Sequence, residues 1–395
     1  MEFHTHLSKS PLHALAALVS GRLSPRSVSD SQWPDLIVLA LGHGLGPMLL
    51  WVIQQAGIDS HDHPLWEPLE SAARTATINY ALLKNTHKRV NAALAEEGIP
   101  ALWLKGIALA PNVYPLPRLR PMVDLDVLVP YAQREEALAI ALSLGFHPPE
   151  GHYWLQVIAP PEDLQHHYHL MGGVDSAICL ELHYRLLGLE MEALLTSEQL
   201  TWFWNQTQEL SQDGTRFTFL KPEAHLLYLC AHAILRHGEG DLYLLRYFDL
   251  HLLVIQANPD WRIVVEQALE LKWSFAVERA LSLAAQFFDT PLPEYVFSQL
   301  RERRPDDEDI SRATRLQSDN FLQEKRKLLL AQMPLTVRIG VLFRRIFPPK
   351  NYMRHLYAVI PGQPLFPYYA YHWFDAGRKV IRSMRSTFSR TLRWR

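Results

Sequence analysis

Two aspartates separated by one residue are the first feature of the sequence that could do chemistry. Residues 123–129 alternate apolar and acidic side chains, which predicts a β-strand. Its apolar residues are expected to face a core: Val123, Leu125 and Val127. Asp124 and Asp126 then share the other face, where a cation would relieve the cost of burying two carboxylates together. Mg²⁺ takes such oxygen ligands together with substrate phosphate oxygens, whereas the alternative for the pair is a solvated strand end.

A third carboxylate lies on a second predicted strand, residues 177–183. The polar face of this strand carries three side chains that can bind metal: Cys179, Glu181 and His183. Glu181 beside the two aspartates gives the three acids that a two-metal phosphoryl-transfer site needs. Gly172, Gly173 and Asp175 predict a hairpin turn that connects this strand to the preceding one, residues 166–171.

A lysine–glycine pair follows a short predicted strand, residues 101–104, and precedes a predicted helix, residues 107–113. Gly106 permits close approach of the backbone, and the start of a helix favours phosphate. Lys105 adds a positive point charge. The pair therefore predicts a phosphate-binding turn next to the acidic strand.

At these motifs the sequence resembles the nucleotidyltransferase superfamily of the polymerase beta type, and more narrowly the group labelled "uncharacterised nucleotidyltransferase". The matching motifs are Leu104-Lys105-Gly106, Tyr114, Arg120-Pro121, Asp124-Leu-Asp126-Val-Leu-Val129 and Glu181-Leu-His183-Tyr184. The flanks match at Gly98-Ile99-Pro100, His232, His237 and Asp249-Leu250, so the resemblance covers roughly residues 30–300. Many members of the wider superfamily carry Gly-Ser at the phosphate turn. The narrower group shares the Lys-Gly pair, in which the lysine ammonium could replace the serine hydroxyl.

The resemblance implies transfer of a nucleoside monophosphate from an NTP to an acceptor hydroxyl or similar group, with release of pyrophosphate. It implies that Asp124 and Asp126 bind Mg²⁺ or Mn²⁺. Glu181 would complete the metal site or act as the base for the acceptor. Lys105 and Gly106 would bind the nucleotide.

For three further residues the sequence is compatible with two different roles. Arg120 contacts phosphate or braces its loop. His183 lines the acceptor pocket or flanks its strand with a hydrogen-bonded ring. His232, which shares a helix face with His225, lines the acceptor cleft or forms hydrogen bonds at an interface. The acceptor is left open between a small molecule, a protein side chain and an RNA end.

Two other polar features have simpler interpretations. In His166-His167-Tyr-His169, alternation puts His167 and His169 on one strand face, a pair that zinc can use. No cysteine partner and no His-Glu-x-x-His helix accompanies the pair, which favours a polar strand face. Asp249 has apolar neighbours and is expected to be the buried partner of an arginine such as Arg246.

The elements that position these residues predict an α+β fold in four parts. These are an N-terminal helical region (1–98), a small mixed-sheet nucleotidyltransferase core (99–220), a C-terminal helical domain (221–335) and a basic tail (336–395). Helices are expected at 69–97, 133–144, 223–236, 242–256, 261–272, 275–287 and 321–330. A further strand is expected at 153–158, and the charged stretch 301–312 is expected to be a linker or exposed loop.

Length and composition indicate an ordinary soluble globular protein. The 395 residues predict two or three domains, and 48% hydrophobic with 20% charged residues is typical of soluble chains. The most apolar early stretch, 36–53, is interrupted by glycines and a proline, which predicts two helix pieces rather than a membrane span. No signal peptide is visible, and only two cysteines, Cys179 and Cys230, favour a reducing cytoplasm.

The basic C-terminal tail is a separate binding candidate. Residues 336–395 contain twelve Lys and Arg and one acid, Asp375, although the whole chain has a net charge of −2. The stretch 378–395 predicts contact with an anionic membrane surface or with RNA phosphates, the alternative being a disordered solubilising tail. Two rival functions therefore stand beside the enzyme. One is a non-catalytic binding or adaptor protein with the nucleotidyltransferase fold, and the other is an RNA- or membrane-surface-binding protein that uses the tail.

Overall fold

A computed structural model describes residues 10–58, 66–149, 166–173, 178–188, 195–212, 214–238, 242–303, 335–348 and 363–374, with the single residues 350, 353 and 357. The chain forms two compact units, residues 1–147 with 166–326 and residues 148–165 with 327–395. The sheet and the candidate site lie in the first unit, and helix α18 (Leu335–Ile346) lies in the second. Four predicted features lie outside the described residues: the strand 153–158, the helix 321–330, most of the charged stretch 301–312, and the basic stretch 378–395.

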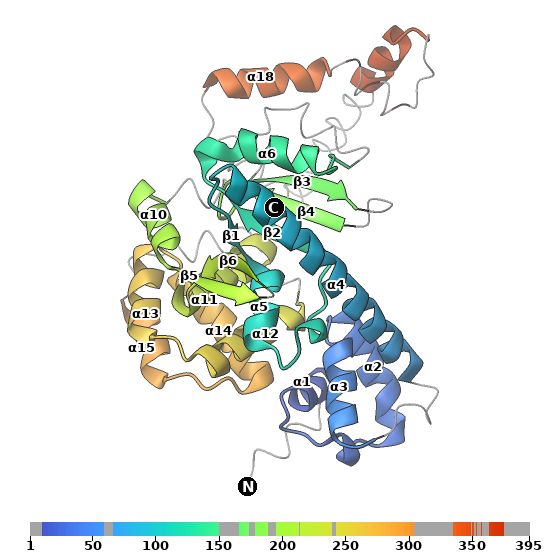
Figure 1. The fold of residues 1–395 in the computed structure, drawn as a ribbon, viewed down its shortest axis with the longest axis vertical. Helices are drawn as coiled ribbons and strands as arrows, with labels where there is room; N and C mark the ends of the chain where they lie inside the picture. Colours follow the sequence, from blue (N-terminus) through green and yellow to red (C-terminus); the bar gives the residue numbers. More distant parts are fainter. Residues whose placement is uncertain are drawn as a thin grey trace, which may run out of the picture. The chain divides into compact units, whose positions relative to one another are not determined.

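The N-terminal region is helical, as predicted (Figure 1), with helices α1 (Pro11–Val19), α2 (Trp33–Gly42), α3 (Gly46–Gln55) and α4 (Glu67–Glu96). The break between α2 and α3 falls at Gly44, whose φ of +71° favours glycine. The prediction of two helix pieces in this stretch is therefore confirmed. α4 ends at Glu96, close to the predicted end at residue 97, and Gly98 follows it with a φ of +66°.

A six-stranded mixed sheet follows, in the strand order β3-β4-β2-β1-β6-β5. Its strands are β1 (Leu102–Trp103), β2 (Asp124–Leu128), β3 (His167–Gly172), β4 (Ile178–His183), β5 (Thr207–Gln212) and β6 (Thr215–Leu220). β2 pairs in parallel with β4, and β1 with β6, while the other three pairs are antiparallel. This sheet with helical regions before and after it confirms the predicted α+β fold.

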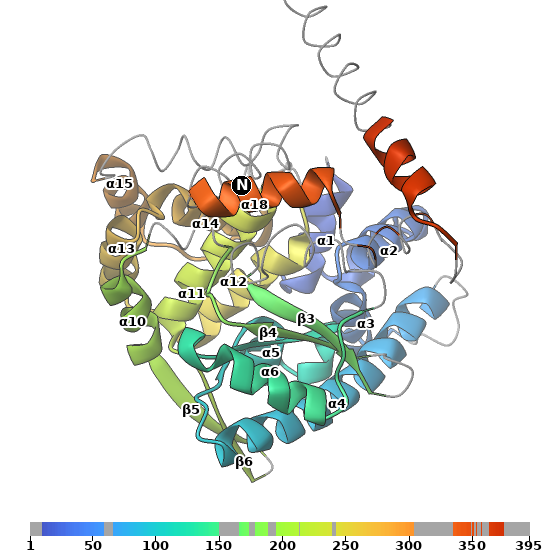
Figure 2. The same cartoon turned by 90° about the horizontal axis from the view of Figure 1, so that it is seen from above.

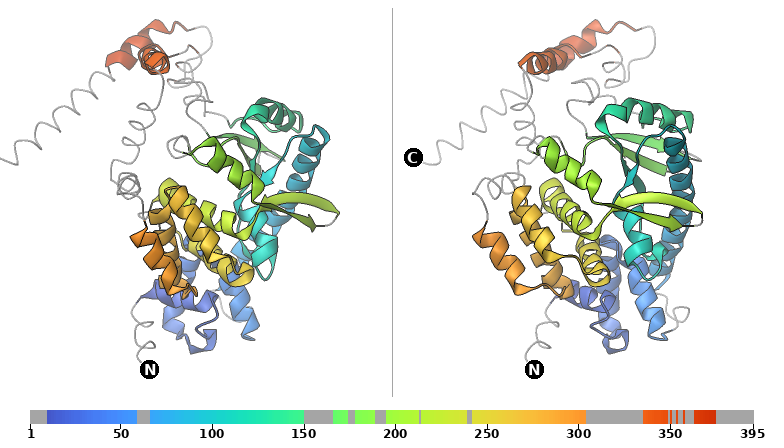
Figure 3. Two further views of the ribbon diagram at one scale, coloured as in Figure 1. Left: turned by 90° about the vertical axis from the view of Figure 1, so that its left-hand side faces the viewer. Right: turned by 60° about the vertical axis from the view of Figure 1, so that its left-hand side comes forward.

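The hairpin of β5 and β6 is absent from the sequence prediction. β5 lies at the edge of the sheet (Figure 3), and its sequence Thr-Gln-Glu-Leu-Ser-Gln has a single apolar residue. An edge strand buries few of its side chains, so it needs few apolar residues. The sequence of β5 therefore lacks the apolar–polar alternation by which strands are predicted. Its partner β6 carries Phe217 and Phe219 into the core.

One face of the sheet packs against α4 and α6 (Arg134–Ser143), as Figure 2 shows. The core on this face is built from strand and helix residues that include Leu125, Val127, Leu180, Leu182, Val90 and Ala137. Val123 was expected on the same face, and this expectation is wrong, since Val123 is 72% exposed. The reason is that β2 begins only at Asp124, so Val123 still belongs to the preceding loop.

Helices from the second half of the unit lie over the opposite face of the sheet. They are α10 (Ser197–Asn205), α11 (Pro222–Ala231), α12 (Leu244–Ala257), α13 (Trp261–Glu270), α14 (Ser274–Phe288) and α15 (Glu294–Glu302). α11 and α12 are the helices that cover the site (Figure 2). The predicted helix 223–236 continues past α11 as a short π-helix, η8 (His232–His237). Within the described part of the chain, no helix combines the length and the apolar character needed to span a bilayer.

Asn91 of α4 ties this helix to two strands and generates a stability prediction. Its Oδ1 accepts a hydrogen bond from the buried Trp103 Nε1 at 2.8 Å, and its Nδ2 donates to the Arg216 carbonyl at 3.0 Å. Asn91→Ala should lower the free energy of unfolding by about 1–3 kcal/mol, because the indole N–H loses its partner. Urea denaturation measures this change.

Asn85→Ala is the matched control, since Asn85 is an exposed asparagine of the same helix and the substitution brings the same gain in helix propensity. Equal unfolding midpoints for the two variants would contradict the prediction.

Candidate active site

The sheet face opposite α4 and α6 carries metal-binding side chains on three adjacent strands. Parallel pairing puts Asp126 of β2 opposite Glu181 of β4, and residues opposite each other on paired strands point to the same side. Antiparallel pairing puts His169 of β3 opposite Glu181, and His167 opposite His183. We call this surface the donor face; it consists of Asp124, Asp126, His167, His169, Cys179, Glu181 and His183.

The Asp126 carboxylate is the most buried acid of the donor face, at 2% exposure, and two cationic groups compensate its charge. Lys105 Nζ donates to Asp126 Oδ1 at 2.7 Å, and His183 Nε2 lies 3.0 Å from the same oxygen. Burial alone would lower the pKa of Lys105, but the charges of Asp126 and Glu181 raise it above its usual value. Burial likewise lowers the pKa of His183, and its hydrogen bonds to the two carboxylates raise it. The two carboxylates therefore favour the charged form of both groups.

The phosphate turn predicted at Lys105 and Gly106 has an unusual backbone. Lys105 is the first residue of α5 (Lys105–Val113), and its φ of +49° lies in the left-handed region, which costs a non-glycine residue about 1–2 kcal/mol. This conformation coexists with the ion pair between Lys105 and Asp126. A Cβ on Gly106 would collide with the Arg120 guanidinium and with Met122. Glycine is thus required here by the close approach of these two side chains.

Arg120 forms a buried ion pair with Asp249 of α12. Its Nε donates to Asp249 Oδ1 at 2.9 Å and its Nη2 to Oδ2 at 2.7 Å, and the Tyr114 hydroxyl donates to Oδ1 at 2.6 Å. Burial by itself would lower the pKa of Arg120, but Asp249 raises it. Of the two roles expected for Arg120, this geometry favours bracing the loop before β2. Asp249 does have an arginine partner, as expected, but Arg120 takes the place suggested for Arg246.

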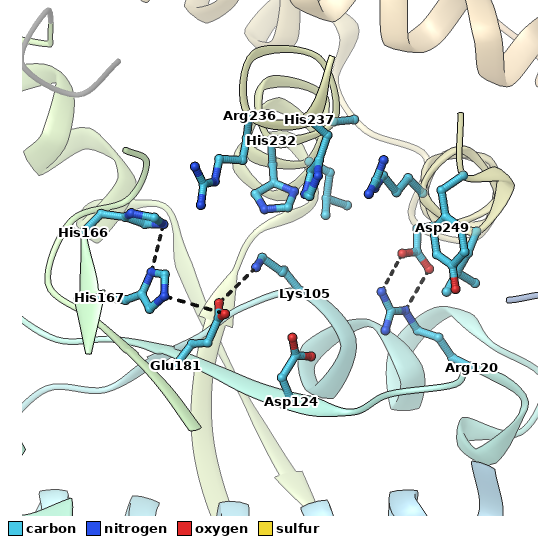
Figure 4. A pocket seen from close by; sticks show the side chains of 15 residues that line it. Lys105, Arg120, Asp124, His166, His167, Glu181, His232, Arg236, His237 and Asp249 are labelled. Carbon is cyan, nitrogen blue, oxygen red and sulfur yellow. Dashed lines mark hydrogen bonds and ion pairs between the residues drawn. The ribbon is translucent and has the colours of Figure 1, made fainter. Parts of the chain in front are cut away.

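A cavity of about 270 Å³ lies between the donor face and the covering helices. Figure 4 shows Asp124, Glu181 and Lys105 on one side, with His232 and Arg236 facing them from the helix above. The remaining residues that line it with charged or polar groups are Arg120, His166, His167, His237, Tyr243, Arg246 and Asp249. Carboxylates predominate on the sheet side of the cavity, where Lys105 accompanies them, and arginines predominate on the helix side, where Asp249 accompanies them.

The π-helix η8 forms much of the helix side of the cavity. π-helical turns are rare and frequently occur at functional sites. Here the turn presents His232, Arg236 and His237, and it ends at Gly238 with a φ of +78°. Burial, followed by the charges of Lys105, His237 and Arg236, lowers the pKa of His232 well below its ordinary value. His232 is therefore a neutral imidazole, which can exchange hydrogen bonds without adding charge.

The carboxylates of the donor face differ in their proton affinity. Burial, and then the charge of Asp126, raise the pKa of Asp124 to about 6. Burial would also raise the pKa of Glu181, but the hydrogen bond with His183 and the charge of Lys105 hold it far below its usual range. Asp126, Glu181 and His183 offer ligand atoms that lie within 4.8 Å of one another, a group that could hold a metal ion.

The structure brings together the residues predicted for the site from the sequence. Five of them line the cavity: Lys105, Arg120, Asp124, Glu181 and His232. Asp126 and His183 lie buried and bonded to each other, and Gly106 packs against Arg120. Sequence analysis missed Arg236, Arg246 and Tyr243. Arg236 could have been found, because it follows His232 by one helical turn.

Comparisons with known proteins give one match. The model of a family described as "Uncharacterised nucleotidyltransferase" matches residues 29–289 of the chain. The comparisons with curated proteins and with solved structures returned no match. The matched span contains α4, the whole sheet, the donor face and both helices that cover the cavity.

The Arg120–Asp249 pair gives a prediction that distinguishes the two roles of Arg120, which are bracing its loop and contacting phosphate. Arg120→Ala should lower the free energy of unfolding by about 3–5 kcal/mol without any nucleotide, because Asp249 is left as an unpaired buried charge. Guanidinium denaturation of the nucleotide-free protein measures this loss.

Arg118→Ala, at an exposed position two residues earlier, is the control and should unfold like the wild type. A bracing role would be ruled out by an Arg120→Ala variant as stable as the Arg118→Ala variant.

Proposed function

Because the chain belongs to the uncharacterised nucleotidyltransferase family, we propose that it is a metal-dependent enzyme that transfers a nucleoside monophosphate from an NTP to an acceptor. The reaction would join the α-phosphorus to an acceptor hydroxyl oxygen and break its bond to the oxygen of pyrophosphate. The hydroxyl proton would pass to a base or to water. The acceptor is a small molecule, a protein side chain or an RNA end.

One observation carries this proposal, namely that carboxylates and guanidinium groups line the same cavity from its two sides. Asp124 and Glu181 line it from the sheet, while Arg236 and Arg246 line it from the helices. A triphosphate that binds with a divalent cation needs both kinds of surface, since carboxylates bind the cation and guanidinium groups bind phosphate oxygens. A cavity lined by acids alone would suit a cation without a polyphosphate.

The donor set fits a divalent cation on the side of the sheet. Asp124, Asp126 and Glu181 would hold Mg²⁺ or Mn²⁺, both of which accept carboxylate oxygens. When bound, the ion supplies positive charge that neutralises the triphosphate and the departing pyrophosphate. Lys105 already contacts Asp126 at 2.7 Å, and two positive charges on one carboxylate repel each other. We therefore assign Lys105, with Gly106 beside it, to the nucleotide phosphates once the cation is present.

The other residues of the site have narrower roles in this proposal. Glu181 belongs to the ion-binding set rather than acting as the base, because His183 lies 3.3 Å from its Oε2 and His167 lies 3.7 Å from its Oε1. His183 is 2% exposed and bonded to two carboxylates, which favours the strand-flanking interpretation over the acceptor pocket. His232 lines the cavity as a neutral imidazole, so it is the candidate for contact with the acceptor.

A second candidate function is a nucleotidyltransferase-fold protein that binds without catalysis. The ion pair between Lys105 and Asp126 favours it, since a side chain of the protein itself satisfies the buried carboxylate without a metal. The two candidates differ in whether NTP is consumed.

Turnover of α-labelled NTPs tests the enzyme directly. The wild type is incubated with each of the four NTPs, Mg²⁺ or Mn²⁺, and a cell extract that supplies acceptors. Labelled product should form and should fall by at least about 100-fold in Asp124→Asn, because the cation loses a ligand. Asp35→Asn, at an exposed position of α2, should retain wild-type labelling.

Labelling that survives in Asp124→Asn would contradict the enzymatic proposal. So would the absence of labelling by the wild type with every NTP and both metals. Saturable NTP binding without labelling would instead support the non-catalytic candidate.

The assignment of Lys105 predicts a change in metal dependence. Lys105→Met should lower the free energy of unfolding of the metal-free protein by about 3 kcal/mol, because Asp126 loses one of its two partners and keeps only His183. A cation that binds only the folded state would offset this loss. Mn²⁺ should therefore raise the Tm of Lys105→Met more than that of the wild type in a thermal melt.

Lys88→Met, on α4 across the sheet, is the control and should respond to Mn²⁺ like the wild type. If Lys105→Met and the wild type show the same Mn²⁺-dependent rise in Tm, Lys105 and the cation do not share the carboxylates.

A further inference from the structure

We propose that the donor face holds a second cation position, where His167, His169 and Glu181 bind a divalent transition-metal ion of the zinc class. This position lies on β3 and β4, whereas the Mg²⁺ or Mn²⁺ assigned above lies on β2 and β4. The inference rests on the geometry of the histidines and does not depend on nucleotidyl transfer. It goes beyond the proposed function because it adds a metal of different chemistry.

The three ligand atoms converge from two strands. His167 Nε2 lies 3.7 Å from Glu181 Oε1, and His169 Nδ1 lies 3.9 Å from the same oxygen. All three atoms lie within 4.8 Å of one another. Around a tetrahedral zinc ion with bonds of about 2.0–2.1 Å, donor atoms lie roughly 3.3–3.4 Å apart. Binding therefore requires each histidine nitrogen to move closer to Glu181 Oε1 by only a few tenths of an ångström, while the two histidine nitrogens, which lie within 4.8 Å of each other, must close by up to about 1.4 Å.

The two oxygens of Glu181 face different partners. Oε1 faces the histidines of β3, while Oε2 lies 3.3 Å from His183 Nε2 and 3.8 Å from Lys105 Nζ. One carboxylate can thus serve the histidine side and the Asp126 side of the donor face at the same time. The second position is distinct from the carboxylate pair, because no atom of Asp124 or Asp126 is needed to form it.

His166 orients one of the proposed ligands. His166 Nε2 lies 3.0 Å from His167 Nδ1, the ring nitrogen that does not face Glu181 (Figure 4). With the proton on His167 Nδ1, this hydrogen bond leaves the Nε2 lone pair directed at Glu181. Histidines that bind metals commonly donate their second ring N–H to a neighbouring acceptor, which fixes the tautomer and the ring plane.

The donor chemistry selects the class of metal. Imidazole nitrogen suits zinc and related transition ions, whereas Mg²⁺ prefers oxygen ligands. Two histidines and one glutamate form a three-ligand set of the kind that leaves a fourth position of zinc open. His167 and Glu181 both line the cavity, so that open position would face the space assigned to the substrate. The third donor is thus neither a cysteine nor part of a His-Glu-x-x-His helix, but a carboxylate on the next strand.

Zinc binding by the full chain tests this position without reference to activity. Protein freed of metal with a chelator is titrated with Zn²⁺ by calorimetry in excess Mg²⁺, and Co²⁺ is followed by its visible absorption. The wild type should bind one Zn²⁺ per chain at the position. His167→Ala and His169→Ala should each weaken binding by at least about 100-fold, because each removes a direct ligand.

Two control variants locate the ion. Asp124→Asn should keep the wild-type affinity for Zn²⁺, since Asp124 belongs only to the other position. His147→Ala removes an exposed histidine whose backbone pairs with Met171 of β3, and it should also keep that affinity. His169 is 38% exposed, so replacing it leaves little void, and His169→Gln with a circular dichroism spectrum guards against loss of folding.

The proposal is overturned if the wild type binds no Zn²⁺ in excess Mg²⁺, or if folded His167→Ala and His169→Ala bind it as the wild type does. It is equally overturned if Asp124→Asn loses Zn²⁺ as completely as the histidine variants, because the ion would then occupy the carboxylate pair. None of these outcomes bears on NTP turnover, so the two proposals fail separately.

Discussion

The burial of the Asp126 carboxylate is the constraint on which the architecture of the site depends. An ionised carboxylate at 2% exposure is tolerated only with compensating positive groups, and Lys105 and His183 provide them. Lys105 contacts Asp126 from the first turn of α5, where its backbone is left-handed. His183 contacts it from β4, the strand that pairs in parallel with β2. Groups from the sheet and from α5 thus meet at one carboxylate.

A second buried charge joins the sheet to the helices that cover it. Arg120 and Asp249 are 129 residues apart in sequence and meet with two hydrogen bonds, at 2.9 and 2.7 Å. Tyr114 adds a third hydrogen bond to the same carboxylate. Because Asp249 belongs to α12, this contact fixes one covering helix against the loop that leads into β2. The carboxylates of the sheet therefore face the arginines of the helices across a cavity whose two sides are held together by this contact.

Local sequence patterns predicted most of the helices and strands of the site. The contacts between their side chains depend on long-range packing and were not predicted. Alternation in β2 and β4 correctly placed Asp126 and Glu181 on one face, since side-chain direction follows from the strand itself. Periodicity likewise predicted α4, α11, α12, α13 and α14, but it did not predict α10 or α15. The partners of Lys105 and Arg120 were not predictable, because they depend on how distant elements pack. On the helix side of the cavity, His232 was among the predicted lining residues and Arg236 was not, and helical periodicity does not distinguish the π-helix η8 from an α-helix.

The π-helix η8 also affects how this site would diverge among relatives. A π-helix closes its hydrogen bonds over five residues rather than four, so it accommodates one residue more than an α-helix of the same rise. Loss of a single residue between His232 and His237 would restore a regular helix and rotate a different side chain toward the sheet. An insertion or deletion of one residue in η8 can therefore change which side chains line the helix side of the cavity, without a substitution at any other position. In an alignment of related chains, a one-residue gap within η8 would therefore indicate a change in specificity. A comparison that counts only substituted residues would miss this change.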